Sequence, residues 1–157
     1  MGASHQYDIA IEWQGNRGSG TTGYRDYGRE HEVRADGKPA LAGSADKTFR
    51  GDASRWNPEE LLVTALAQCH MLAYLHLCVE AGVVVVGYED AAVGTMVQDD
   101  EGPGGQFTRV LLRPLVTVAS ASMVEQAQAL HEKVGAVCFI ARSVNFPVDH
   151  EPRVKAE

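Results

Sequence analysis

Clusters of basic residues are missing from this sequence, and aromatic residues are sparse at 7%. The 14 Lys and Arg residues are outnumbered by 21 Asp and Glu, which gives a formal net charge of -7. The arginines are scattered along the chain, mostly beside acids. Because nucleic acids and anionic lipids attract clustered positive charge, the sequence predicts neither nucleic acid nor a membrane surface as a partner.

Targeting and membrane-spanning segments are not apparent either. Residues Met1 to Tyr7 are polar and lack the apolar core of a signal peptide. The longest apolar stretch, Leu61 to Val86, is interrupted by polar residues and a glycine, so we do not expect it to cross a bilayer. The interruptions are Gln68, His70, His76, Glu80 and Gly82. We therefore expect a cytoplasmic protein, and 157 residues suit a single domain, 1-157, with its own core.

Cysteine is rare, with only Cys69, Cys78 and Cys138. Three cysteines do not make a disulfide scaffold, which leaves buried thiols, a metal site or redox chemistry. The metal reading is weak because the chain has no Cys-x-x-Cys motif, and because Cys69 and His70 would point about 100° apart on a helix. We expect no metal site, and the interest falls on the thiols.

The residue pattern predicts an α+β fold with the order βββ-α-ββ-α-β. The predicted strands are residues 7–14, 24–34, 39–49, 83–98, 107–119 and an edge strand over 145–154 that contains two prolines. Ala35-Asp36-Gly37 and the glycine-rich segment 102–105 predict hairpin turns. Ser122 and Glu125 form a capping box for a second helix that ends near Val134 or Gly135.

The first helix has the clearest signals. Asn57 is a good N-cap, Pro58 suits the first helical position, and Glu60 completes a capping box. The helix should continue to about Ala81 and stop at Gly82. Its expected buried face is almost continuous, and a helix this apolar must be covered on most sides by a sheet or a partner subunit. That face comprises Leu62, Ala65, Leu66, Cys69, Leu72, Ala73 and His76.

Two segments carry the chemistry: NPEELLVTALAQC, from Asn57 to Cys69, and HEKVGAVC, from His131 to Cys138. With them the chain resembles the OsmC/Ohr family of peroxide-reducing proteins. That family has an Asn-Pro-Glu helix start, a cysteine ten residues after the glutamate, and a second cysteine late in the chain. Glu59, Cys69 and Cys138 match this pattern, and the order of elements agrees over nearly the whole chain.

The resemblance implies an OsmC/Ohr-like fold, with antiparallel sheets around a long central helix, in an intertwined homodimer. It also implies a thiol peroxidase that reduces organic hydroperoxides. Cys69 would attack the peroxide and become a sulfenic acid, Cys138 would resolve it as an intramolecular disulfide, and an external dithiol reductant would restore both thiols. No cofactor is implied: no metal, flavin or haem is needed. The apolar surroundings expected for Cys69 suit an alkyl peroxide better than hydrogen peroxide.

A thiol attacks peroxide as the thiolate, and burial alone disfavours the thiolate, so a cation must lie near Cys69. In the family this cation is an arginine held by the glutamate at the helix start, here Glu59. Arg25, in Gly23-Tyr24-Arg25-Asp26, is the nearest match. Arg29 is the second choice and Arg50 the third.

Helix geometry adds a prediction about assembly. Glu59 and Cys69 are ten residues apart on one helix, so they lie about 15 Å apart along its axis. One glutamate cannot bridge that distance to orient an arginine that touches Cys69 of the same chain. We therefore expect a site shared between subunits, with Cys69 and Cys138 from one chain and Glu59 and Arg25 from the other.

Simpler interpretations remain for each residue. Cys69 and Cys138 could be buried structural thiols, as we expect for Cys78. Glu59 could serve only the helix dipole, and Arg25 could be a solvated charge. For the whole protein, the alternatives are a non-catalytic binding protein for a small apolar ligand and a thiol redox sensor. The family usually has Phe after the first cysteine and Pro after the second, whereas this chain has His70 and Phe139.

Overall fold

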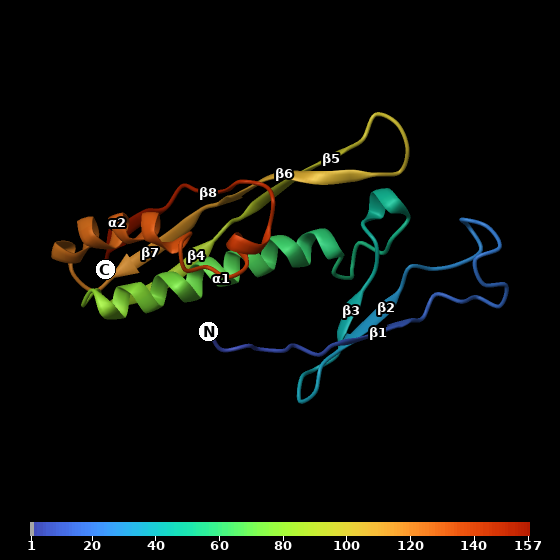
Figure 1. The fold of residues 1–157 in the computed structure, drawn as a ribbon, viewed down its shortest axis with the longest axis horizontal. Helices are drawn as coiled ribbons and strands as arrows, with labels where there is room; N and C mark the ends of the chain where they lie inside the picture. Colours follow the sequence, from blue (N-terminus) through green and yellow to red (C-terminus); the bar gives the residue numbers. More distant parts are fainter. Residues whose placement is uncertain (1) are drawn as a thin grey trace. The chain divides into compact units, whose positions relative to one another are not determined.

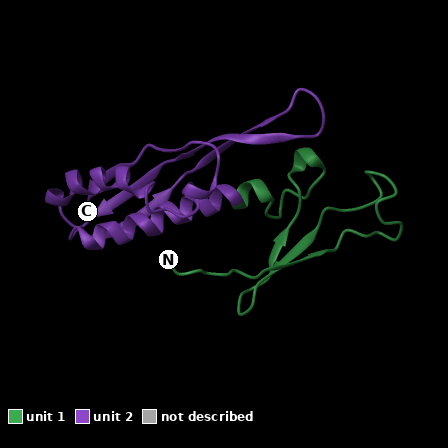
Figure 2. Cartoon of the chain, viewed as in Figure 1, with its two compact units in different colours: residues 1–61 green, residues 62–157 purple. Residues whose placement is uncertain are grey.

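A computed structural model describes residues 2–157. The chain divides into two compact units, residues 1–61 and residues 62–157, which are drawn in different colours in Figure 2.

The first unit is built around a three-stranded antiparallel sheet in the order β1-β2-β3. Its strands are β1 (Ala10–Trp13), β2 (His31–Arg34) and β3 (Leu41–Gly43), followed by the short 3-10 helix η1 (Lys47–Phe49). The hairpin turn predicted at 35–37 is confirmed, since the N–H of Lys38 donates to the carbonyl of Ala35 at 3.2 Å.

The strand predicted over 24–34 is wrong for residues 24–30, which form a turn, an isolated bridge at Tyr27 and irregular backbone. The two chain segments approach closely here, because a Cβ on Gly15 would come within 1.9 Å of the Gly28 carbonyl oxygen. The indole N–H of Trp13 donates to the same carbonyl at 2.8 Å, and the Gly28 N–H donates to the Gly15 carbonyl at 2.8 Å. With the Trp13 indole bonded to the Gly28 carbonyl, the regular ladder is interrupted before β2 begins. The third predicted strand, 39–49, is shortened to β3 in the same unit.

The long helix α1 (Pro58–Glu80) begins and ends as the sequence predicts. The amide N–H of Glu60 donates to Oδ1 of Asn57 at 2.8 Å, and the Glu60 carboxylate accepts from the Asn57 N–H at 3.4 Å. This is the reciprocal capping box expected from the sequence. Gly82 follows the helix with φ of +71°, a conformation that glycine adopts without strain.

The second unit contains two three-stranded sheets (Figure 1). One has the order β4-β7-β9, with β4 (Val85–Asp90), β7 (Pro114–Val118) and β9 (Arg153–Ala156). The other has the order β5-β6-β8, with β5 (Val93–Gln98), β6 (Gly105–Leu112) and β8 (Val148–His150). The strands β8 and β9 join the edges of these sheets in parallel pairings, and the remaining pairings are antiparallel.

Each of the three long strands predicted for this unit, 83–98, 107–119 and 145–154, is broken into two. The break between β6 and β7 follows from Pro114, which has no N–H to donate, and from Arg113, whose N–H donates to Oδ1 of Asp90 at 2.8 Å. Pro152 separates β8 from β9 in the same way. The α+β class is confirmed, and the prolines place the last strands at sheet edges, as predicted.

The second helix, α2 (Val124–Val134), is entered through a 3-10 turn, η2 (Ala121–Met123). The capping box predicted at Ser122 is wrong, because the oxygen of Ser120 accepts from the N–H of Ser122 at 3.2 Å and caps η2 instead. The additional turn moves the cap two residues towards the N-terminus.

Both helices contribute to one core with strand β7. The fully buried face of α1 consists of residues four apart: Leu66, His70, Tyr74 and Cys78. Leu72 is 62% exposed in a single chain and His76 lies on the surface beside Glu80, so burial of this part of the expected face would require a partner subunit. Tyr74 and Cys78 pack with α2 and β7 in this core. The partners from α2 and β7 are Ala127, Leu130, Val134, Val116 and Val118.

Helix α1 is long and apolar enough to cross a membrane by length and composition, with a mean hydropathy of 1.5 over its most apolar 18 residues. The buried core helix of a globular unit passes the same test. Only 22% of that stretch is buried within the chain. Most residues of this helix are partly buried, and the apolar Leu72 and Val79 are exposed in a single copy.

Candidate functional site

Cys69 and Cys138 lie together in the second unit, although 69 residues separate them in the sequence. Cys69 is on α1 and packs against the core cluster that contains Cys138. The two thiols are close enough for Cys69 to affect the pKa of Cys138, and no disulfide joins them. The fold thus brings together the two thiols that the sequence singled out.

The Cys138 thiol is held in its protonated form. It is 2% exposed, and burial, with the Cys69 thiol as the next cause, raises its pKa to about 11. The amide N–H of Ala141 donates to Cys138 Sγ at 3.4 Å and opposes this shift.

Cys69 is partly exposed, in contrast to its partner. It is therefore accessible to a small molecule while it packs against the core cluster that contains Cys138. Access to the sulfur is one requirement of a nucleophilic thiol.

Cys78 is a buried thiol of a different kind. It is 1% exposed, and burial raises its pKa, partly offset by a hydrogen bond with Tyr74. It lies nine residues beyond Cys69 on α1, about 13 Å along the helix axis. The expectation that Cys78 fills the core agrees with this burial.

Glu59 lies in the first turn of α1, and Oε2 of its carboxylate is buried with no hydrogen-bond partner among residues 2–157. Since α1 is continuous from Pro58 to Glu80, the separation of about 15 Å between Glu59 and Cys69 holds along one helix. A buried carboxylate oxygen without a hydrogen-bond partner lowers the stability of the fold. The Glu59 carboxylate is therefore suited to bind a cationic side chain that a single chain does not supply.

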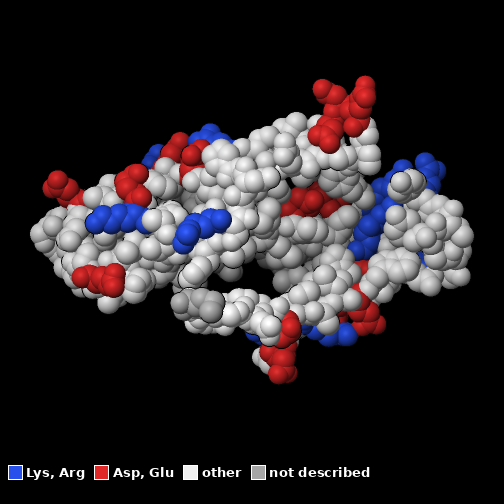
Figure 3. All heavy atoms as spheres, viewed as in Figure 1, with Lys and Arg blue, Asp and Glu red and all other residues white. Residues whose placement is uncertain are grey.

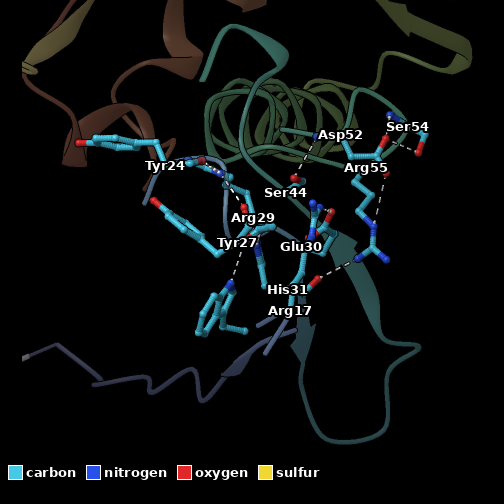
Figure 4. A network of polar contacts seen from close by, with 12 residues as sticks. Arg17, Tyr24, Tyr27, Arg29, Glu30, His31, Ser44, Asp52, Ser54 and Arg55 are labelled. Atoms are coloured by element: carbon cyan, nitrogen blue, oxygen red, sulfur yellow. Dashed lines mark hydrogen bonds and ion pairs between the residues drawn. The ribbon is translucent and has the colours of Figure 1, made fainter. Parts of the chain in front are cut away.

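The three candidate arginines lie in the first unit, and the structure distinguishes their surroundings. Arg29 donates to the carbonyls of Tyr24 and Tyr27 at 2.9 and 2.7 Å, and its guanidinium lies 4.0 Å from the centre of the Tyr27 ring (Figure 4). It therefore closes the loop before β2. Arg25 is exposed in that loop, and Arg50 is exposed with a left-handed φ of +65°. Of these, Arg29 has the most evident structural role.

A buried histidine cluster lies beside the thiols and was not predicted from the sequence. Nε2 of His70, the residue after Cys69, is 2.9 Å from Nδ1 of His131 on α2. His131 stacks on the Tyr74 ring at 3.9 Å, and His150 of β8 lies 5.5 Å from His70 between ring centres. Burial, with the neighbouring histidines as the next cause, lowers the pKa of His70 to about 4 and of His131 to about 3.

Of these histidines, the sequence suggested His70 and His131 only as possible metal ligands, and it gave no role to His150. No group of three His, Cys, Asp or Glu side chains within residues 2–157 has the arrangement of a metal site. Because His70 and His131 are 61 positions apart in the sequence, no local spacing could have paired them.

The family model for OsmC-like proteins matches residues 51–153, and the chain belongs to this family. The match includes Glu59, Cys69 and Cys138. A search of curated proteins found no match.

Solved structures agree with the family assignment. An OsmC-like protein of unknown function from Vibrio cholerae is 28% identical, with a TM-score of 0.84 over 96% of this chain and 100% of that one. An organic hydroperoxide resistance protein from Legionella pneumophila is 17% identical, with a TM-score of 0.65 over 98% of this chain and 99% of that one. A putative organic hydroperoxide resistance protein from Vibrio cholerae with captopril bound is 21% identical, with a TM-score of 0.65 over 98% and 94%. The last two likenesses define the fold alone.

Proposed function

We propose that this protein is a thiol peroxidase that reduces organic hydroperoxides. The observation that carries the proposal is the contact between the partly exposed Cys69 and the buried, protonated Cys138. Relatives of the same fold that are named organic hydroperoxide resistance proteins support the choice of substrate. A binding protein for an apolar ligand would have no need for two thiols in contact.

The chemistry proceeds in two balanced steps. The Cys69 thiolate attacks the terminal oxygen of the hydroperoxide, the O–O bond breaks, and the alcohol leaves once its alkoxide takes up a proton. Cys69 is then a sulfenic acid. The sulfur of Cys138 attacks the sulfenic sulfur, its thiol proton leaves with the hydroxyl as water, and the disulfide forms. An external dithiol supplies two electrons and two protons to restore both thiols.

The raised pKa of Cys138 fits the resolving role and not the attacking one. A thiol with a pKa of about 11 is almost fully protonated near neutral pH, so it reacts slowly with free peroxide. Against an adjacent sulfenic acid, proximity compensates for low thiolate content. The order Cys69 first, Cys138 second therefore follows from their surroundings.

We predict that the reduced protein consumes cumene hydroperoxide over many turnovers when dithiothreitol is supplied. The apolar side chains around Cys69 should favour this substrate over hydrogen peroxide, because burial of each apolar group of a substrate contributes to binding. Peroxide loss is followed colorimetrically at equal concentrations of the two oxidants. Consumption no faster than in buffer with dithiothreitol alone contradicts the proposal.

We also propose that the protein acts as a homodimer with shared sites. Helix α1 leaves apolar side chains uncovered in one copy, with Leu72 62% and Val79 78% exposed. The residues Ile9, Ile11 and Trp13, along and just before β1, are exposed as well. A second copy would cover such apolar surface, and its Glu59 and Arg25 would supply the cation for Cys69.

Substitution of Leu72 by Asp is expected to dissociate this dimer, because it places a charge in apolar contact. Sedimentation velocity at micromolar concentration should shift from about 34 to about 17 kDa, the mass of one chain being 17.0 kDa. Lys133→Asp introduces the same side chain on the exposed face of α2 and should leave the dimer intact. A monomeric wild type would contradict the shared site.

The distribution of charged side chains on the surface does not favour binding of a polyanionic partner. Around α2 and the C-terminal strands, Lys and Arg lie among Asp and Glu, and the tip of the β5–β6 hairpin is acidic (Figure 3). The tip carries Asp99, Asp100 and Glu101, all of them exposed. We therefore propose no nucleic-acid or membrane partner, and a cytoplasmic location stays a prediction.

A further inference from the structure

The hydrogen bond between His70 and His131 has an unusually well-defined geometry. The two rings are tilted by only 10°, and their centres are 5.2 Å apart. The bonded nitrogens are 2.9 Å apart, so the distance between the ring centres is about the N···N distance plus the radius of each ring. The rings therefore lie end to end in nearly one plane, which is the arrangement of a linear N–H···N hydrogen bond.

The direction of this bond follows from burial. His131 is fully buried, and its Nε2 has no hydrogen-bond partner among the described residues. A buried N–H without an acceptor is rarer and costlier than an acceptor without a donor. The proton of His131 therefore belongs on Nδ1, which donates to Nε2 of His70.

This bond lies at the level of the two thiols. His70 follows Cys69 on α1. On the other side, His131 precedes Val134 by one helical turn, and the Val134 carbonyl accepts from the N–H of Cys138 at 2.9 Å. Each histidine is thus tied to one of the two cysteines through a short stretch of hydrogen-bonded backbone.

A second buried bond joins the same helices one turn further on. The hydroxyl of Tyr74 donates to the Ala127 carbonyl at 3.0 Å. This hydrogen bond is also buried and also links α1 to α2, but it lies further from the two thiols along each helix. It provides an internal comparison for the histidine bond.

We propose that the His70–His131 hydrogen bond is a positioning element that fixes the spacing of α1 and α2 at the thiols and so holds Cys138 within reach of Cys69. This role concerns the dithiol site of the proposed peroxidase. Neither imidazole touches the peroxide, and each acts through the backbone that carries its cysteine. The position after Cys69, where the family usually has Phe, thereby contributes to closure of the disulfide.

The test measures thiol positioning without peroxide. Reduced protein is equilibrated in buffers of reduced and oxidised glutathione, where the two cysteine thiols and one oxidised glutathione give the protein disulfide and two reduced glutathione molecules. The fraction of Cys69–Cys138 disulfide is read by alkylation and mass spectrometry. The equilibrium constant reports how closely the folded protein holds the two sulfurs.

His131→Phe keeps an aromatic ring against Tyr74 but removes the donor, and it should lower this equilibrium constant about tenfold. His131→Asn places an amide N–H near the position of Nδ1 and should restore most of the loss. Tyr74→Phe removes the comparison bond and should leave the constant within about twofold of wild type. If His131→Phe does not fold, His70→Met removes the same bond from the α1 side.

An unchanged constant in His131→Phe, or in His70→Met, overturns the proposal. So does an equal loss in Tyr74→Phe, which would assign the effect to general packing between the helices. Failure of the peroxidase function is distinguishable, because a wild type that forms the disulfide with glutathione but not with peroxide retains the positioning role and loses only the proposed activity.

Discussion

Replacement of Cys69 by Ser is expected to reduce hydroperoxide consumption to the uncatalysed rate. The hydroxyl of serine is not ionised near neutral pH and is a far weaker nucleophile towards oxygen than a thiolate. Cys138 cannot take over, because burial, the larger cause of its raised pKa, persists when Cys69 is replaced. The loss should therefore be complete even though two cysteines remain in the protein.

Replacement of Cys138 by Ser should give a different result. Cys69 still attacks, so about one equivalent of peroxide per chain is consumed quickly, and turnover then stops at the sulfenic acid. With excess peroxide, Cys69 should continue to the sulfinic acid, a mass gain that dithiothreitol does not reverse. Cys78→Ser is the matched control, and it should turn over as wild type does.

These three variants separate the candidate functions. Full turnover by Cys69→Ser would remove Cys69 from the mechanism. Disulfide formation without repeated turnover in the wild type would favour a redox sensor, and unreactive thiols would favour a binding protein for an apolar ligand. Thiol counts and intact masses after each addition of peroxide provide the measurement.

Mild acid is expected to destabilise the protein through the buried histidines. The pKa values of His70 and His131 in the folded state, about 4 and about 3, lie below that of an unfolded histidine. Between the unfolded and folded values the unfolded chain binds protons that the folded chain does not. Stability is therefore complete above about pH 6.5 and falls as the pH is lowered through this window.

The expected loss of stability in mild acid is large for a small protein. At pH 5 each of the two histidines lowers the free energy of unfolding by up to about 2 kcal/mol relative to pH 7.5. Urea unfolding followed by circular dichroism at these two values of pH measures the effect. Carboxylates titrate mostly below this range, which keeps their contribution small.

A double variant, His70→Met with His131→Phe, should show a much smaller loss between pH 7.5 and pH 5. The exposed His76, on the same helix as His70, supplies the control, because His76→Gln should retain the full acid sensitivity. An equal pH dependence in wild type and double variant would contradict the assignment to the buried pair.

The sequence predicts this fold well where local signals are strong. The caps at Asn57 and Gly82 define both ends of α1, and they depend on backbone groups within a few residues. Strand lengths are predicted poorly, in part because a break can depend on a distant partner as well as on a local proline. The N–H of Arg113 is satisfied by Asp90, a residue 23 positions away on another strand.

The candidate site likewise contains some residues that the sequence predicts and others that it does not. Glu59, Cys69 and Cys138 could be selected from motif spacing, and the fold brings the two thiols into contact. The His70–His131 bond could not be predicted, because tertiary packing alone pairs two residues so far apart in the chain. The choice among Arg25, Arg29 and Arg50 stays a prediction, with Arg29 already bonded to the carbonyls of its own loop.

The most direct test of the central claim is a single turnover. Reduced protein is mixed with one equivalent of cumene hydroperoxide, quenched with an alkylating reagent, digested and mapped by mass spectrometry. We predict the loss of two thiols, one equivalent of cumyl alcohol, and a disulfide that joins Cys69 to Cys138. Survival of both thiols in excess peroxide, or a disulfide that involves Cys78, would contradict the proposed mechanism.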